Sequence, residues 1–284
     1  MFLILLAGRF SFNAGSMTVL FKGGETVYIL GKGVKVRTTD YDIRGSHGVY
    51  YEGAGVVRLY RANITSSNLK MRADSLYYRR RDRYLRLIGN AYFEDAYRKV
   101  SGRKIIARGD STWVLGNVYV ESKTKGIIVE GDSAFYDGKE AFGYVMGNAY
   151  AKILRRDTVE IRANLFVLHR DTTFGVGEVV AESRRFRATG DTFRVIMADT
   201  SLKSLLIFGD ARVEWQNGEG TSRSVEITFR DGYVEYVIFR DSARVLYHEG
   251  GSTIDVSGNY IRALSVKDTL KHILVRDLFE GRYR

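Results

Sequence analysis

The triplet Gly131-Asp132-Ser133 could carry chemistry, because one class of serine hydrolases displays its nucleophile in this phrase. A serine nucleophile needs a general base beside it, and it is needed at one unique position in the chain. Here the triplet occurs a second time as Gly109-Asp110-Ser111, and Ala73-Asp74-Ser75 has the matching position in an earlier segment. Leu165 and Thr192 replace the serine in later segments. A residue that recurs in this way is expected to serve turn and strand-edge geometry, so we predict a structural role for Ser133.

Other side chains that commonly do chemistry are absent or scattered. The 284-residue chain has no cysteine, which excludes disulfides, thiolate metal sites and thiol catalysis. Four histidines lack the close spacing of metal ligands; they are His47, His169, His248 and His272. The acidic residues lie mostly in expected turns and give no specific support for a pair of catalytic carboxylates. We therefore expect a protein that is not an enzyme and that uses no metal and no cofactor.

The chain is strongly basic, with 44 Lys and Arg against 33 Asp and Glu and a net charge of +11. This charge favours an anionic partner such as a phosphorylated lipid, a membrane surface or nucleic acid. Arginine is suited to bidentate contacts with phosphate. Two clusters are candidates for such contacts: Arg79, Arg80, Arg81 and Arg83, and Arg184, Arg185 and Arg187. The alternative is that both clusters are solvated turns or outer faces, where basic side chains also discourage unwanted strand pairing.

One phrase recurs along the chain with a period near thirty residues. LIGNAYFE at 87–94 returns as VLGNVYVE, VMGNAYAK, GVGEVVAE and IFGDARVE. Its central residue recurs at intervals of 27, 31, 30, 32 and 31 residues, at Gly89, Gly116, Gly147, Gly177, Gly209 and Arg240. Such a period indicates a chain built from copies of one supersecondary element.

A second phrase alternates with the first and is joined to it by turn residues. Asp74 precedes Gly89 by 15 residues, and Asp132 precedes Gly147 by the same 15. Asp137-Gly138 lies between two alternating runs, which is a strong hairpin signal. The other expected turns are Arg81-Asp82, Arg170-Asp171-Thr172, Asp199-Thr200, Arg230-Asp231-Gly232 and Lys267-Asp268. Each repeat is therefore expected to form a strand, a tight turn and a second strand.

Alternating side chains support strands with one buried face. In 225–229 every second residue is apolar, which is the period of an antiparallel sheet with one face covered. We find no convincing helical stretch. The expected inward set is Ile161, Leu165, Val167, Phe193, Val195, Met197, Val213, Trp215, Val225, Ile227 and Phe229. This set fits both the filled core of a closed sandwich and the lining of an apolar groove, and the sequence leaves both open.

The first 15 residues form a candidate export signal. MFLILLAGRFSFNAGS begins with an apolar run and reaches small residues at 14–16, but it is short and has no positively charged start. An ordinary first strand is the alternative. We divide the chain into this candidate signal at 1–15 and a single elongated β domain at 16–284. No stretch approaches the roughly 20 apolar residues that a transmembrane helix needs.

The two alternating phrases together resemble the OstA-like family, which includes the lipopolysaccharide-transport protein LptA and the periplasmic domain of LptD. ADSLYY and GDSAFY carry the resemblance, together with the repeated GNAY and GNVY. The stretch 131–180 is the closest match, and the resemblance covers about residues 69–248. These motifs are short, and their repetition in register makes them specific.

The resemblance implies an all-β fold, an open, twisted antiparallel β-jelly-roll built from hairpin repeats of about 30 residues. In that family, apolar side chains between the sheets shelter lipid acyl chains, and jelly-rolls stack end to end through their terminal strands. It therefore implies a non-catalytic protein of the periplasm, or one associated with the outer membrane, that binds lipopolysaccharide or a similar anionic glycolipid. The implied protein partners are LptC-like and LptD-like jelly-roll proteins and further copies of the chain. The inward set would line the lipid groove, and the arginine clusters would contact the headgroup.

Two other hypotheses remain open. Repeats of about 30 residues also suit a structural or carbohydrate-binding β-solenoid at the cell surface, although its parallel coils need longer crossovers than these hairpin signals allow. A basic sheet surface for nucleic acid requires an exposed stacking platform. The aromatic residues follow the inward alternation instead, so we expect no nucleic-acid partner.

Overall fold

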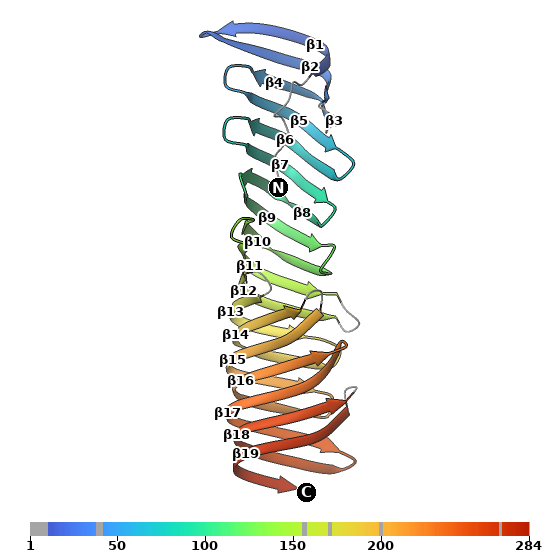
Figure 1. Cartoon of the computed structure of the whole chain (residues 1–284), viewed down its shortest axis with the longest axis vertical. Helices are drawn as coiled ribbons and strands as arrows, with labels where there is room; N and C mark the ends of the chain where they lie inside the picture. The colour runs from blue at the N-terminus through green and yellow to red at the C-terminus, as the bar shows by residue number, and fades with distance from the viewer. Residues whose placement is uncertain are drawn as a thin grey trace. The chain divides into compact units, whose positions relative to one another are not determined.

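The chain folds into strands throughout the part that the computed structural model describes, where 19 β-strands and no helix are found (Figure 1). The described residues are 11–37, 42–154, 158–169, 172–198, 201–266 and 269–283. They divide into two compact units: a first unit of residues up to 124 with 130–145, and a second unit of 125–129 with 146–284. Strands β10 (Ile127–Asp137) and β11 (Phe142–Ile153) contribute residues to both.

The first unit is a meander of antiparallel strands. Its further strands are β1 (Ser11–Lys22), β2 (Glu25–Arg37), β3 (Asp42–Gly45), β4 (His47–Tyr51), β5 (Val56–Thr65), β6 (Leu69–Arg79), β7 (Tyr84–Asp95), β8 (Arg98–Arg108) and β9 (Ser111–Ser122). The hairpin of β1 and β2 comes first. The short β3 and β4 both pair with β2 and with β5. From β5 to β9 each strand pairs with the next.

The second unit repeats the hairpin without interruption. Its further strands are β12 (Val159–His169), β13 (Thr172–Glu182), β14 (Phe186–Ala198), β15 (Ser201–Trp215), β16 (Gly218–Arg230), β17 (Tyr233–Glu249), β18 (Ser252–Val266) and β19 (Thr269–Tyr283). Every strand from β12 to β18 pairs antiparallel with the strand that follows it. A hairpin of about 30 residues is therefore the building element, as the repeat predicts.

The tight turns that the structure describes fall where the sequence predicts them. Arg81-Asp82 lies between β6 and β7, and Asp137-Gly138 lies at the end of β10. Asp231 and Gly232 join β16 to β17 with φ angles of 54° and 80°, the left-handed pair that a two-residue hairpin turn requires. The predicted turn residues 170–171, 199–200 and 267–268 lie outside the described residues.

From β7 to β15, every second strand has a pair of left-handed residues at the repeated glycine of the first phrase. Gly89 and Asn90 have φ angles of 72° and 46°, and Gly209 and Asp210 have 79° and 41°. At each of these pairs the register with the neighbouring strand shifts, as in a β-bulge. We call this pair of left-handed residues, together with the residues opposite it on the neighbouring strands, the corner, and we call the two parts of each strand on either side of it its arms.

The aspartate of the second phrase lies against the corner of the next strand. The side-chain amide of Asn90 donates to both carboxylate oxygens of Asp74, over 3.1 and 3.4 Å. A Cβ atom added to Gly89 would lie 2.2 Å from Asp74 Oδ2, and one added to Gly209 would lie 2.1 Å from Asp191 Oδ2. The repeated Asp therefore fixes a bend in the strand, which is a structural role of the kind predicted for the Gly-Asp-Ser triplet.

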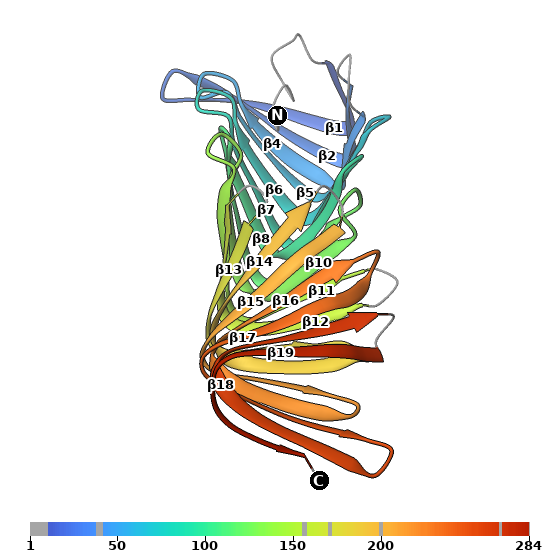
Figure 2. The same cartoon turned by 60° about the horizontal axis from the view of Figure 1, so that its bottom comes forward.

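Each arm buries one face against the interior of its unit. In the second unit the arms fold over one another, and the strands in Figure 2 bend back on themselves accordingly. Phe186 precedes the corner of β14 and Phe229 follows that of β16, yet their ring centroids are 6.0 Å apart. Side chains that are at most 2% exposed fill this interior: Phe166, Phe193, Leu205, Ile207, Ile227, Phe239 and Ile261. The first unit buries Leu59, Met71, Leu87 and Ile105 on the equivalent face.

The alternation changes phase on the strands that lie against a left-handed pair, and this corrects part of the predicted inward set. Ile161 and Ala163 are buried as predicted. The register of β12 against β13 then shifts between Arg162 and Leu165. After this shift Phe166 is buried, whereas Leu165 and Val167 are only half-buried on the opposite face. The prediction that these two residues point inward is wrong, because at this shift two residues of β12 lie opposite three of β13, which breaks simple alternation.

These features confirm the predicted fold class, an all-β antiparallel β-jelly-roll built from hairpin repeats. Antiparallel pairing contradicts the parallel coils of the β-solenoid hypothesis. Residues 1–10 of the candidate export signal lie outside the described residues, and the single domain over 16–284 stays a prediction. In the part of the chain described, no helix is present that could cross a membrane.

Candidate functional site

An apolar pocket opens between the two arms of the second unit. It holds about 560 Å³ of space that no atom fills, a volume that includes open solvent. Its walls are almost entirely apolar, and Arg185 and Ser265 supply its polar side chains. The lining residues are Arg185, Phe186, Val213, Trp215, Ile227, Val234, Val237, Ala263, Ser265 and Leu270.

The register of the sheet explains why these residues meet. On one arm Phe186 of β14 is directly opposite Trp215 of β15. On the other arm Ile227, Val237 and Ala263 lie side by side in one row across β16, β17 and β18. Because the arms fold over one another, the two rows face each other across the pocket. The pocket is thus a direct product of alternation on both arms.

Aromatic contacts close one side of this pocket. Phe186 packs against Phe229, and Trp215 lies with its centroid 6.4 Å from that of Phe239. The guanidinium of Arg185 lies 4.7 Å from the ring centroid of Tyr233. This cation–π contact joins the residue before β14 to the first residue of β17. Trp215 is only half-buried, so the pocket wall is reached by solvent there.

The predicted groove residues fall into four groups. Val213, Trp215 and Ile227 line the pocket. Ile161, Phe193, Val195, Met197 and Val225 are buried in the filled interior of the same unit. Phe229 packs on Phe186 at the closed side, and Leu165 and Val167 are on the outer face. Their role as lipid contacts stays a prediction.

Other lining residues were missed by the sequence reasoning. Phe186 follows three polar residues and belongs to no alternating run that was recognised. Val234 and Val237 are three positions apart, yet both line the pocket, because the register of β17 shifts near Phe229. A bulge of this kind breaks the period-two signal.

The two arginine clusters differ in what they can contact. Arg79 donates through Nε and Nη2 to the two oxygens of Asp82, over 2.8 and 2.7 Å. This bidentate contact lowers the pKa of the Asp82 carboxyl and holds the Arg79 side chain at the turn between β6 and β7. Arg80 and Arg81 line a shallow depression together with Arg108, at the ends of β6 and β8. Arg83 is exposed and is outside this lining.

In the second cluster, only Arg185 reaches the apolar pocket. Arg187 forms an ion pair with Glu182 over 2.7 Å. Arg184 is exposed. The headgroup role predicted for the clusters stays a prediction.

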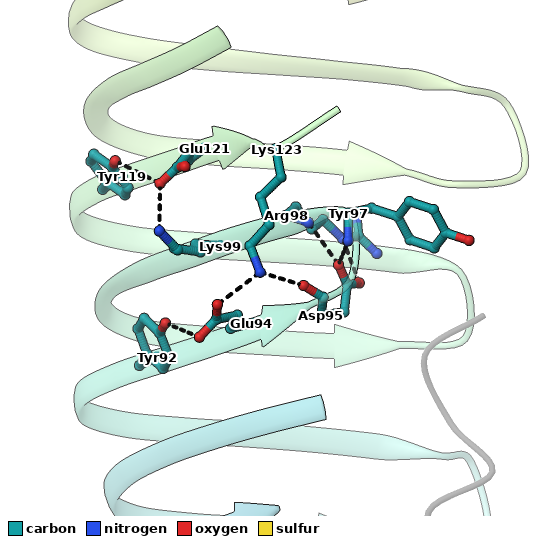
Figure 3. A network of polar contacts seen from close by, with 9 residues as sticks. All are labelled: Tyr92, Glu94, Asp95, Tyr97, Arg98, Lys99, Tyr119, Glu121 and Lys123. Atoms are coloured by element: carbon teal, nitrogen blue, oxygen red, sulfur yellow. Dashed lines mark hydrogen bonds and ion pairs between the residues drawn. The ribbon is translucent and has the colours of Figure 1, made fainter. Parts of the chain in front are cut away.

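A network of polar side chains covers the outer face of β7, β8 and β9 in the first unit (Figure 3). Lys123 Nζ donates to Glu94 over 2.7 Å and Tyr92 Oη donates to the same carboxylate over 2.6 Å. These contacts lower the pKa of Glu94 to about 2. Burial, followed by the bond to Glu94, raises the pKa of Tyr92 to about 12. Lys99 and Glu121 form a second pair over 3.0 Å, so the network balances its own charge.

Aromatic residues also gather on the outer face of the first unit, which corrects the expectation that they follow the inward alternation. Trp113, Phe135 and Tyr144 form a run with centroid separations of 5.2 and 5.4 Å. Arg86 covers the ring of Tyr77 at 5.3 Å. These ring faces are engaged by one another and by a guanidinium, which is unlike an open platform for bases. The absence of a nucleic-acid partner stays a prediction.

Among the described residues, no group of three or more His, Cys, Asp or Glu side chains is placed to hold a metal ion. His47 bonds to Ser46 over 3.0 Å and stacks on Tyr60 at 4.3 Å. His248 bonds to Thr253 over 3.0 Å. Both imidazoles thus take part in local strand contacts.

Comparison with known proteins finds likeness among solved structures alone. No protein-family model and no curated protein matches the chain. Among solved structures, it is similar to LptH from Pseudomonas aeruginosa, the LptA-homologous periplasmic component of a lipopolysaccharide transport device. The two share 17% identity, with a TM-score of 0.32, over 40% of this chain and 80% of LptH. The fold class therefore rests on the strand pairing of this chain itself.

Proposed function

We propose that the protein is a non-catalytic carrier of an anionic glycolipid such as lipopolysaccharide, and that the apolar pocket of the second unit receives lipid acyl chain. The observation that carries this proposal is an apolar pocket, open to solvent, with an arginine in its wall. Acyl chain in water costs about 0.8 kcal/mol for each exposed CH₂ group. A pocket with apolar walls on both sides removes that cost, and a guanidinium suits a phosphate or carboxylate nearby.

The proposed location and partners follow from the same function. A lipid carrier of this class would act in the periplasm or beside the outer membrane. It would pass its lipid to LptC-like or LptD-like jelly-rolls, or to further copies of the chain, by strand addition at its first and last strands. Exposed apolar side chains on these strands support such docking: Phe21 of β1 is 85% exposed, and Phe279 of β19 is 61% exposed.

The test is lipid loading of protein purified from a lipopolysaccharide-producing host. Mass spectrometry of the purified wild-type protein is expected to detect acylated glycolipid. Val237 is half-buried in the pocket wall, so Val237→Asp should reduce loading at least tenfold, since a buried carboxylate disfavours an adjacent acyl chain. The matched control is Ile238→Asp, on the other face of the same strand, which should keep its lipid. Wild-type protein without glycolipid, or equal loading of both variants, would contradict the proposal.

A further inference from the structure

We infer that the ends of β6 and β8 in the first unit form a binding site for the phosphate groups of a phosphorylated saccharide, with Arg80, Arg81 and Arg108 as its cations. The expected source of this saccharide is the headgroup of the carried glycolipid, so the inference rests on the function proposed above. The evidence comes from the charges around the depression at these strand ends, from the ion pair inside it and from the backbone contacts that fix its arginines.

Three exposed arginines from two strand ends line the same depression. Arg80 and Arg81 belong to the turn after β6, and Arg108 is the last residue of β8. In the register of the sheet, Tyr84 of β7 is opposite both Arg79 and Arg108. The ends of β6 and β8 are therefore two strand spacings apart, about 10 Å, and arginine side chains from both ends can contact one ligand.

The lining of the depression has more positive than negative charge, with four arginines against two carboxylates. Arg79 donates to both oxygens of Asp82, over 2.8 and 2.7 Å, and this pair balances itself. Arg108 Nε lies 3.8 Å from the same carboxylate, and its side chain is 64% exposed. The other carboxylate, Glu52, accepts a hydrogen bond from the Tyr28 hydroxyl over 3.2 Å. Two positive charges are left in excess.

This excess charge is confined to one turn. Arg80 and Arg81 form no ion pair with another residue in the described part of the chain. The turns at the same ends of the following strands differ, because the turn after β8 has Asp110 and the turn after β10 has Lys139 beside Glu140. Several guanidinium groups in one place favour phosphate, whose oxygens accept paired hydrogen bonds from the planar N–H donors.

Backbone contacts fix the turn that presents these arginines. Arg80 N donates to the carbonyl oxygen of Gly55 over 3.0 Å, and Arg83 N donates to that of Arg80 over 3.3 Å. Ala54 N donates to Glu25 Oε1 over 2.8 Å. The turn after β6 is thus bonded to the turn after β4, and the latter is bonded to β2. A ligand therefore meets a backbone that is already ordered, which lowers the entropy cost of binding.

The experiment titrates the full chain with deacylated lipopolysaccharide, which keeps the phosphorylated saccharide and lacks the acyl chains. Isothermal titration calorimetry at low ionic strength should show saturable binding that weakens with added salt, because salt screens exposed charges. Binding should be lost when the phosphates are removed enzymatically, and equal affinity for the dephosphorylated saccharide would overturn the phosphate site. Inorganic phosphate should bind about tenfold more weakly, since several phosphates on one saccharide engage more arginines than one does. Equal affinity for inorganic phosphate would overturn the glycolipid as the source.

Two variants test the site from its two strand ends. Arg81→Gln and Arg108→Gln should each weaken binding of the deacylated lipopolysaccharide about fivefold, the effect of losing one exposed charged contact. Arg83→Gln is the matched control, because Arg83 belongs to the same turn, is exposed and is outside the lining. It should bind like the wild type. If Arg83→Gln weakens binding as much as the other two variants, net charge alone explains the binding and the site is wrong.

The outcomes separate this inference from the proposed function. If the deacylated saccharide does not bind while purified protein still carries glycolipid, the phosphate site is wrong and the carrier function stands. If the saccharide binds through these arginines and purified protein carries no glycolipid, the phosphate site stands and the carrier function is wrong. Val237→Asp, in the apolar pocket, should bind the deacylated saccharide like the wild type. A loss of binding in that variant would assign the saccharide to the pocket and overturn the site in the first unit.

Discussion

The two units are built from the same hairpin and the same corner, yet they use their faces differently. In the first unit the distinctive chemistry lies on the outer face, where Lys123 and Glu94 pair and Trp113 packs against Phe135. In the second unit it lies between the arms, where the apolar pocket opens beside Arg185. One repeat thus supports both a charge-balanced exterior and an internal apolar pocket.

The two units differ at the ends of their arms, whereas their corners are alike. Gly89-Asn90 in the first unit and Gly209-Asp210 in the second have nearly the same φ angles. The pocket depends on side chains far from the corner, such as Trp215 at the last residue of β15. The corner therefore sets the architecture, and the residues at the arm ends decide whether the interior is filled or open.

The largest expected effect is a loss of stability when a cavity is created in the filled interior of the first unit. Leu87 of the first unit is 1% exposed, so Leu87→Ala should lower the free energy of unfolding by about 3 kcal/mol, from lost burial and the cavity left behind. Val237→Ala, in the half-open pocket wall, should cost about 1 kcal/mol or less. Urea unfolding followed through tryptophan emission measures both. If both substitutions lower the free energy of unfolding by the same amount, the interiors of the two units do not differ in packing.

A smaller effect is expected from substitution at a corner. Gly209→Ala places a Cβ at a φ of +79° and 2.1 Å from Asp191 Oδ2, and should cost about 2 kcal/mol, from backbone strain and displacement of the carboxylate. Gly251→Ala is the matched control, because its φ is +87° with no atom within 4 Å of the added Cβ. The control isolates the strain alone. If both variants have the same unfolding free energy, the contact between Asp191 and the corner is unimportant for stability.

The smallest effect should be seen in the acid response of the first unit. The folded-state pKa of Glu94 is about 2, below its ordinary value of 4.5, so its stabilising contribution is present above about pH 4.5 and is lost as the pH falls toward 2. Lys123→Met removes the main cause of this shift, and should therefore reduce the loss of thermal stability between neutral and acidic pH. Lys104→Met provides the control, as a lysine outside this network. If Lys123→Met loses as much thermal stability on acidification as the wild type, the pair of Lys123 and Glu94 does not determine the acid response.

Much of the fold can be predicted from the sequence, because its signals are local. Phe193, Val195 and Met197 are buried as the alternation predicts, since no corner interrupts that run. Simple alternation places Leu165 and Val167 on the wrong face, because two residues of β12 lie opposite three of β13 at the register shift before Leu165. Period-two reasoning therefore holds along an uninterrupted run and fails across a corner or a bulge.

The site is harder to predict, because it depends on contacts between arms. Arg79 and Asp82 are three residues apart, so their pairing follows from the turn between them. Arg185 and Tyr233 are separated by 48 positions in the sequence and meet because the arms fold over one another. No pattern within either segment specifies that meeting. The opening of the pocket beside Trp215 likewise depends on the distance between the two arms. The alternation of apolar and polar residues along one strand does not specify that distance.

The corner has a consequence for how this protein assembles itself and how its length can change. Asp74 and the Gly89-Asn90 pair belong to consecutive strands, so each bend is completed within one hairpin. Contacts so near in sequence lose little chain entropy on closing and favour rapid folding that starts at any hairpin and spreads to its neighbours. Gene duplication of one whole hairpin would then lengthen the stack without disturbing the bends on either side.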